Sequence, residues 1–393
     1  MLRLSTLLAT FCLSALTSYS LDAQISDRVI DSIYQKGLEY MDQFKFNDAV
    51  KCFYECQRER HDQPVYHYFL ARAYEQLGNI QDARLFYQKA HHLDSIEVKY
   101  LMALGNIELQ RRDYRAAKKF YQTAVLLDST NSFYHKQLGK TCYYTNEMVC
   151  ALESFDKSLY YNNRDLETNI LLAQIYYDNQ QYDVCLDWII KGLRLDAGNP
   201  RLLNLKLRAE VKSEDYEVAI MTSERLIETG DSSYQVMKYY GIALNKTEEY
   251  EQAIDVLNPL LDKKEDEGLH YYLGDSYAAI GDVDNSIRHL EIAAYDFGIG
   301  PMVWRYFHKL SRLYSETGNT RFALRYMERA YDLHSDPLIL YQLARLTDTY
   351  YQDKQMAVNR YNQYLATDDS LFRDNVMDRI SELKQYLHQS KVK

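Results

Sequence analysis

The sequence is poor in the residues that break helices. Its 393 residues include only 14 Gly and 5 Pro, and a chain with so few breakers is usually helical. Charged residues make up 26% and hydrophobic residues 47% of the chain, which is the composition of a folded protein rather than a disordered one. The scarcity of Gly and Pro therefore excludes a sheet-and-turn architecture and low-complexity segments.

Positive charge and catalytic motifs are also scarce. The 46 Lys and Arg residues stand against 56 Asp and Glu, which gives a net charge of −10. Phosphate contacts demand a basic surface, so we expect no nucleic acid as a partner. The sequence has no His-Glu-x-x-His, Cys-x-x-Cys, Gly-x-Ser-x-Gly or Walker motif, and we therefore expect no enzymatic activity, no cofactor and no metal site.

Residues 1–23 have the pattern of a secretory signal peptide. Arg3 supplies the positive end, an uncharged and mostly apolar run follows from Leu4 to Leu16, and small residues precede a cleavage point after Ala23 or Ser20. The apolar run is too short to span a bilayer comfortably, and no second run of spanning length follows. We predict an exported chain without a membrane span, in the periplasm or associated with the outer membrane, and secreted otherwise.

Five cysteines remain after such a cleavage. Cys142 and Cys150 are placed to meet across one helical hairpin, whereas Cys52 and Cys56 lie one helical turn apart and suit a bridge poorly. Scattered cysteines are more often small buried hydrophobic residues than a disulfide framework. We therefore predict that all five are buried thiols, with the Cys142–Cys150 bridge as the alternative.

Small residues recur through the chain at a spacing close to 34. They are Gly37, Ala71, Gly105, Gly139, Ala173, Gly241, Gly274, Ser311 and Ala344, with Leu207 in the one exceptional place. A second small residue follows twelve positions after each, except that Ala357 comes one residue late. Each unit predicts two amphipathic helices that cross closely at the small residues. Neither helix can bury its apolar stripe alone, so the units must stack.

Turn and start signals repeat in the same register. Gly78, Gly281 and Gly318 occupy one slot between the two helices, where a helix ends with a left-handed residue. Three prolines each open a unit, at the position where a helix tolerates proline: Pro64, Pro200 and Pro337.

This pattern resembles the tetratricopeptide repeat (TPR) family. The residue pair Leu70-Ala71, with Tyr74, Ala83, Tyr87 and Ala90, matches the family signature throughout, and the resemblance covers about Arg28 to Ser370 in ten units. It implies an all-α, right-handed superhelical solenoid of about ten helix-turn-helix units with a C-terminal capping helix. Units one to eight would occupy residues 28–300, units nine and ten residues 301–370, and the capping helix and tail residues 371–393.

Several positions depart from the family pattern. Lys36 precedes the small residue of the first unit, and Leu207 replaces it in the sixth, so we expect both units to pack loosely. Pro259 should kink or end a helix, and residues 298–301 (Gly-Ile-Gly-Pro) should form a hinge or an irregular linker. His67, His135 and His270 share repeat position four, and we predict that they are core imidazoles rather than metal ligands.

The resemblance also implies that the first helices of the units line a concave groove. At the positions that face it, basic residues outnumber acidic ones although the chain as a whole is acidic, and tyrosines lie among them. Tyr and Arg make rigid, amphipathic contact anchors. The predicted partner-binding residues are Tyr68, Lys136, Lys140, Tyr143, Tyr144, Tyr177, Asn204, Arg208, Lys212, Lys238, Lys246, Tyr271, Arg312 and Arg345.

These features predict a non-enzymatic scaffold or adaptor in the cell envelope. Its protein or peptide partner would present an extended, acidic segment to the groove. Tyrosine platforms with Arg, Asn and Gln also suit sugars, so a glycan or cell-wall polymer is the alternative ligand. The Lys and Asn pair with which some family members grip a peptide carboxylate is absent from every unit.

Overall fold

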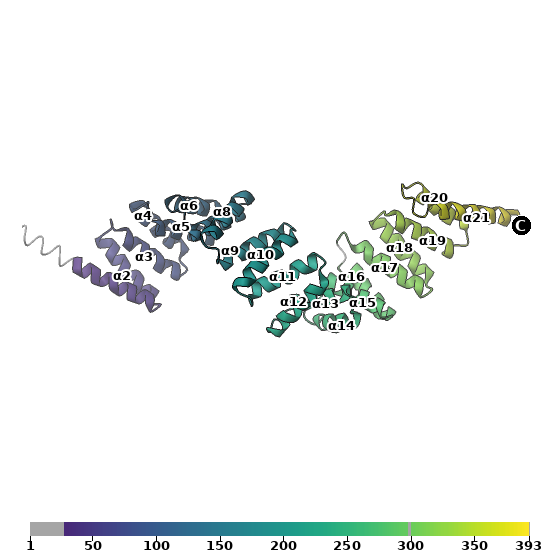
Figure 1. Ribbon diagram of the computed structural model, residues 1–393, viewed down its shortest axis with the longest axis horizontal. Coiled ribbons are helices and arrows are strands. Elements are labelled where there is room, and N and C mark those ends of the chain that lie inside the picture. The colour runs from purple at the N-terminus through teal and green to yellow at the C-terminus, as the bar shows by residue number, and fades with distance from the viewer. Residues whose placement is uncertain (1–26, 298–299, 393) are drawn as a thin grey trace, which may run out of the picture. The chain divides into compact units, whose positions relative to one another are not determined.

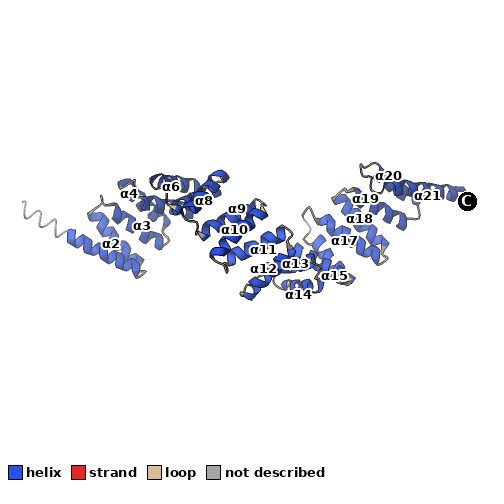
Figure 2. Ribbon diagram, viewed as in Figure 1, coloured by secondary structure: helices blue, strands red, loops and turns tan. Residues whose placement is uncertain are grey.

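The computed structural model describes residues 27–297 and 300–392, and every regular element in this part of the chain is a helix (Figure 2). The predicted signal peptide and two residues of the predicted hinge, Gly298 and Ile299, lie outside the described residues. The chain divides into two compact units at Leu172.

The first unit consists of helix pairs from residue 27 onward. In each pair an odd-numbered helix packs most closely against the even-numbered helix that follows it (Figure 1). The helices are residues 27–42, α2 (Phe46–Glu59), α3 (Pro64–Gln76), α4 (Ile80–Leu93), α5 (Val98–Gln110), α6 (Tyr114–Leu127), α7 (Ser132–Tyr144), α8 (Met148–Tyr161) and the start of α9 (Leu166–Asp178).

The second unit repeats the same arrangement and ends with a longer helix. Its elements are α10 (Tyr182–Leu195), α11 (Pro200–Lys212), α12 (Tyr216–Glu228), α13 (Tyr234–Lys246), α14 (Tyr250–Leu257), the 3₁₀ turn η1 (Asn258–Leu260), α15 (Glu267–Ala279), α16 (Val283–Tyr295), α17 (Val303–Glu316), α18 (Thr320–Leu333), α19 (Pro337–Tyr350), α20 (Lys354–Leu365) and α21 (Arg373–Val392). The predicted all-α fold of stacked helix pairs is confirmed.

The helix ends and helix starts predicted from Gly and Pro are present. Gly78, Gly281 and Gly318 adopt positive φ angles of 76°, 83° and 80°. Pro64, Pro200 and Pro337 are the first residues of α3, α11 and α19. α14 ends at Leu257, and Pro259 lies in the 3₁₀ turn that follows, so the expected interruption of that helix is also confirmed.

α21 covers the last apolar face of the second unit. Its Val376, Ile380 and Leu383 are buried and pack in one cluster with Tyr361 and Tyr364 of α20. This contact is the one expected of a capping helix, because a stack of helix pairs otherwise exposes an apolar face at its end.

Within a pair, the two helices approach closely because a small residue faces a large one. A Cβ added to Gly105 would lie 2.7 Å from the Tyr121 ring, and one added to Gly139 would lie 2.7 Å from the Phe155 ring. Both contacts are shorter than van der Waals distance, so a larger residue at either place would force the facing ring to shift. In both pairs the large residue comes 16 positions after the small one.

At Leu207 the sizes of the two facing residues are exchanged: the large residue comes first and the small one follows 16 positions later. We expected loose packing here, but Leu207 is 1% exposed and belongs to a buried cluster with Leu203 and Leu226. Sixteen positions later stands Ser223, which is fully buried, where other pairs have Tyr121 or Phe155. The small partner makes room for the large side chain, so the prediction of loose packing in this pair was wrong.

The three histidines at repeat position four are buried, as predicted. Their exposed fractions are 3% for His67, 2% for His135 and 2% for His270. His67 Nε2 donates to the carbonyl oxygen of His61 at 2.9 Å, and His135 Nε2 donates to that of Ser129 at 2.8 Å. These two imidazoles therefore fix the loop that leads into their own helix.

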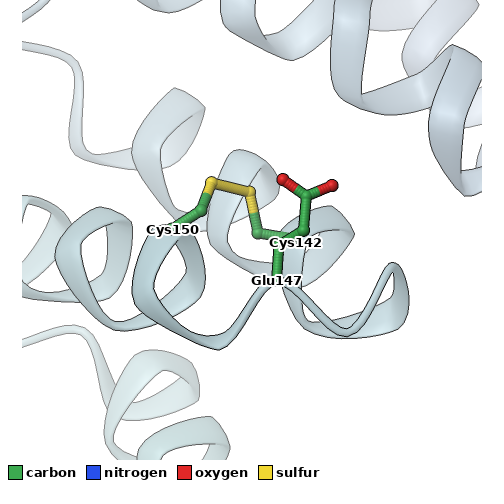
Figure 3. A group of neighbouring side chains, drawn as sticks. All are labelled: Cys142, Glu147 and Cys150. Atoms are coloured by element: carbon green, nitrogen blue, oxygen red, sulfur yellow. A yellow bond between two sulfur atoms is a disulfide. The ribbon is translucent and has the colours of Figure 1, made fainter.

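The prediction that all five cysteines are buried thiols was wrong for one pair, and it holds only in part for Cys52, a free thiol that is half-buried. Cys142 at the end of α7 and Cys150 in α8 form a disulfide, with their Cα atoms 5.7 Å apart (Figure 3). The short turn between α7 and α8 brings the two positions within bridging range. Burial raises the pKa of Cys56 and of Cys185 to about 11, so neither is a reactive thiolate at neutral pH.

The exchanged sizes of Leu207 and Ser223 predict a non-additive pair of substitutions. Leu207→Ala should destabilise the α11–α12 pair by about 3 kcal/mol through a cavity, and Ser223→Leu by about 2 kcal/mol through overpacking. The double variant should recover at least about 1 kcal/mol of the summed loss. Hydrogen–deuterium exchange of α11 and α12 measures this, and strictly additive losses would contradict the size pairing.

The disulfide predicts local sensitivity to reductant. Opening a loop of this length costs about 2.5 kcal/mol in the chain-entropy description, so reduction should speed amide exchange in α7 and α8. The Cys142→Ser/Cys150→Ser variant should exchange fast with or without reductant, whereas Cys52→Ser should behave as the wild type. Alkylation of both Cys142 and Cys150 in the unfolded, unreduced protein would show that no bridge exists.

Candidate functional site

The predicted partner-binding residues lie on the odd-numbered helices, from Tyr68 on α3 to Arg345 on α19. They fall into three groups according to what their side chains contact. Some are held in ion pairs within the protein, some lie against aromatic rings, and some line hollows in the surface.

Two predicted cations of the first unit are neutralised by the next repeat. Lys136 Nζ lies 3.0 Å from Asp165 and 2.9 Å from Glu167, and Lys140 Nζ lies 3.1 Å from Glu167. Lys136 is only 9% exposed. We predicted that both lysines contact a partner, but their charge is used to join α7 to the start of α9.

The second unit uses the same contact twice more. Lys238 of α13 forms an ion pair at 2.6 Å with Asp266, which also accepts from the Tyr234 hydroxyl at 2.6 Å. Asn204 of α11 donates to Asp231 at 2.9 Å. In each case repeat position five of one odd-numbered helix binds an acid just before the next odd-numbered helix. We call this contact the inter-repeat clip: Lys136–Asp165, Asn204–Asp231 and Lys238–Asp266.

The clip and its surroundings change how carboxyls titrate. Burial opposes ionisation of Asp266, a clip acid, and of Glu167, which lies beside the clip, yet hydrogen bonds from the lysines outweigh it and lower the pKa of both carboxyls. A pKa that is lower in the folded state adds stability above the ordinary pKa of the carboxyl, and that stability is lost as the pH falls.

A second group of predicted residues lies against aromatic rings. The Arg208 guanidinium lies 4.4 Å from the Tyr177 ring centre, and Lys246 Nζ lies 5.8 Å from that of Tyr272. The Nζ atom of Lys309 lies over the Tyr271 ring, 5.1 Å from its centre. Among the described residues no ion pair forms with Arg208, Lys212 or Lys246. These cations keep their charge available at the surface.

The remaining predicted tyrosines have packing partners. Tyr68 lies between the rings of Tyr87 and Tyr100, at 5.6 and 5.4 Å. Tyr144 is 49% exposed and stacks on Tyr114 at 4.7 Å, and its neighbour Tyr143 has a ring centre 5.7 Å away. Tyr68 is therefore packed within a row of aromatic side chains. Tyr144 of α7 packs against Tyr114 of α6, which belongs to the preceding repeat.

The first unit has a hollow of about 430 Å³ on its odd-numbered helices. Tyr68 and Arg72 of α3, Lys99 and Asn106 of α5, and Tyr134 of α7 line it, together with two carboxylates, Glu75 and Glu97. Lys99 lies 3.5 Å from Glu97, and Glu75 accepts from the Tyr87 hydroxyl at 2.7 Å. The hollow therefore offers aromatic faces with charges of both signs.

The second unit has a hollow of about 300 Å³ between α17 and α19. Its lining residues are Ser311, Arg312, Ser315, Met327, Gln342, Arg345, Leu346 and Thr349. Two of them, Arg312 and Arg345, belong to the predicted set and occupy the same repeat position in consecutive repeats. The structure thus brings together two of the predicted cations beside one cavity.

One group of side chains has the composition of a metal site, namely Cys142, Glu147 and Cys150 (Figure 3). The disulfide occupies both sulfur atoms, and Glu147 forms an ion pair with Lys118 at 2.5 Å. In this state the group offers a cation only one carboxylate, which is already neutralised.

Comparison with known families identifies the repeated unit. Tetratricopeptide repeat models match residues 34–95 and residues 98–131. These segments are tetratricopeptide repeats. The same helix pairs continue through the described part of the second unit. Proteins built from tetratricopeptide repeats are typically non-catalytic scaffolds. No curated protein matches the sequence.

Several solved structures are similar to parts of the chain. The PilF protein of Pseudomonas aeruginosa is 21% identical, with coverage of 54% of this chain and 97% of its own and a TM-score of 0.46. YrrB, "a TPR protein with an unusual peptide-binding site", is 18% identical, with 48% and 97% coverage and a TM-score of 0.42. A TPR protein of Parabacteroides merdae is 12% identical, with 70% and 96% coverage and a TM-score of 0.38.

No helix in residues 27–297 and 300–392 combines the length and the apolar character needed to cross a bilayer.

Sequence reasoning missed the acids of the inter-repeat clip. Asp165 and Asp266 come directly before an odd-numbered helix, 28 or 29 residues after a lysine at repeat position five. That spacing is a usable signal, because an acid at a helix start faces the preceding repeat.

The clip predicts a loss of stability that depends on pH. Lys238→Met should destabilise the α13–α15 region by about 2 kcal/mol at pH 7, because it leaves Asp266 partly buried without its cation. The difference from the wild type should shrink between about pH 5 and pH 3 as Asp266 becomes protonated. Hydrogen exchange at pH 7 and at about pH 3 measures this difference in stability, and the exposed Lys263→Met serves as the control. An equal difference at the two pH values would contradict the assignment.

Proposed function

We propose that this chain is a non-catalytic interaction scaffold of the cell envelope. Its odd-numbered helices bind an extended, acidic segment of a partner protein. The observation that carries the proposal is that predicted contact residues line hollows on these helices, at Tyr68 in the first unit and at Arg312 and Arg345 in the second. Repeat proteins generally use such extended surfaces for binding.

The charges that remain available favour an acidic segment. Lys136, Lys140 and Lys238 are neutralised by the inter-repeat clip and the adjacent Glu167, so the attraction must come from other residues. Arg208 and Lys212 keep their charge on α11, and Arg345 keeps its charge on α19. In a protein of net charge −10, these sites are where an acidic chain meets least repulsion.

A glycan is the second candidate ligand, and the hollow of the first unit favours it. Tyr68 and Tyr134 offer aromatic faces, and Asn106 offers an amide group beside charges of both signs. Sugars stack on such faces and need donors and acceptors together. The same experiment separates the two ligands.

Photo-crosslinking tests the proposal. A benzophenone amino acid at position 99 or 345 should crosslink a protein segment in the envelope fraction of the source cells, and mass spectrometry should identify that segment as acidic. The control position is Leu126 of α6, which is 84% exposed on an even-numbered helix. Crosslinks from position 126 alone would overturn the proposal, and carbohydrate adducts from position 99 would favour the glycan.

Charge substitution gives an independent readout. Arg208→Glu with Lys212→Glu should weaken capture of the crosslinked segment at least about fivefold. Their charges hold no ion pair in the described structure, so the fold should persist. Substitutions at Lys136 or Lys238 test stability instead and are unsuitable for this purpose.

A further inference from the structure

We propose that the hollow between α17 and α19 is a carboxylate subsite, in which Arg312 and Arg345 together bind one Asp or Glu side chain of the partner segment. This inference rests on the proposed function and assigns to one place the chemistry that recognises acidity.

The charge of the hollow is the first argument. Its lining includes two guanidinium groups and no carboxylate. A neighbouring hollow of about 220 Å³ contains Asp275 and Glu316 beside Lys309 and Arg312, and the hollow of the first unit contains Glu75 and Glu97. Unlike these two, the hollow between α17 and α19 has cations in its lining and no acid.

The second argument is that the acid nearest to Arg345 in the helix is already occupied. Asp348 lies one turn further along α19, where it could neutralise Arg345. Instead, Asp348 Oδ2 accepts from Arg379 of α21 at 2.8 Å, and Lys354 Nζ lies 3.4 Å from Oδ1. The Arg345 guanidinium rests near the Tyr341 ring at 5.9 Å, and no ion pair involves it among the described residues.

The ion pair between Arg312 and Glu316 is weak enough for a ligand carboxylate to displace Glu316. Glu316 lies 3.8 Å from Arg312, and the two side chains are 62% and 66% exposed. An exposed pair of this kind contributes little. A carboxylate that enters between two guanidiniums gains charge-assisted hydrogen bonds from both, and the planar fork of arginine matches its two oxygens.

Neutral groups complete the subsite. Gln342 accepts from His308 Nε2 at 2.5 Å through its amide oxygen, which leaves its amide nitrogen as a donor. The exposed Ser315 adds a hydroxyl group, whereas the Thr349 hydroxyl donates to the carbonyl oxygen of Arg345 at 3.0 Å. Met327 and Leu346 supply apolar surface for the methylene groups of the bound side chain.

Peptide binding to the full chain tests the subsite. The probes are fluorescein-labelled peptides with six glutamates, six glutamines or six phosphoserines between the same Gly-Ser flanks, measured by fluorescence anisotropy at low salt. Arg312→Gln and Arg345→Gln should each weaken binding of the glutamate peptide about fivefold, and the double variant about twentyfold. Arg325→Gln is the matched control, because Arg325 is an exposed arginine of α18 that does not line the hollow.

The contrary outcomes separate this inference from the proposed function. Unchanged binding in the double variant, with a loss in Arg72→Gln/Lys99→Gln, would place acid recognition in the first unit and overturn the subsite while the scaffold stands. Binding of the phosphoserine peptide alone would overturn the assignment to carboxylates. If no acidic peptide binds but position 345 still crosslinks a neutral segment, the subsite fails and the scaffold stands. If no peptide binds and nothing is crosslinked, both fail.

Discussion

The close crossing of two helices within each repeat is the constraint on which the rest of the structure depends. Gly105 and Gly139 face Tyr121 and Phe155 so tightly that a single Cβ would overlap the ring. The crossing fixes which stripe of each helix is buried, and therefore which residues of the odd-numbered helices remain at the surface. Leu207 with Ser223 shows that the requirement concerns the summed size of two side chains. Either helix can supply the large one, because a core responds to total volume as well as to the residue at one position.

Contacts between repeats set the charge that this surface presents. The odd-numbered helices carry many cations, but an acid before the next helix takes up the charge of Lys136 and of Lys238. Basic residues at groove positions therefore serve two purposes, and sequence position alone does not separate them. Partner residues do: Lys136 and Lys238 bind acids at the start of the next repeat, whereas Arg345 forms no ion pair within the described residues and lies near the Tyr341 ring. The available positive charge is thus concentrated at a few sites.

The fold could be predicted from the sequence because its signals repeat. The spacing near 34, the left-handed glycines such as Gly78 and the prolines such as Pro200 each report one local requirement, and stacking turns them into an architecture. Contacts in which one residue depends on the identity of another were not predictable from these signals. The exchange at Leu207 depends on a residue 16 positions away, and the Cys142–Cys150 bridge depends on the geometry of one turn. The roles of Lys136 and Lys140 depend on Asp165 and Glu167 at the start of the next repeat, which the period of small residues does not describe.

The capping helix affects recognition as well as stability. α21 covers the apolar end of the second unit with Val376 and Ile380, and the same helix brings Arg379 to Asp348. Asp348 is the acid one turn away from Arg345 on α19, and it is bound by Arg379 and by Lys354 instead. By binding Asp348, the cap leaves Arg345 with an unpaired charge beside the cavity. The capping helix therefore affects the charge of this surface without lining the hollow, because its Arg379 competes with Arg345 for the carboxylate of Asp348.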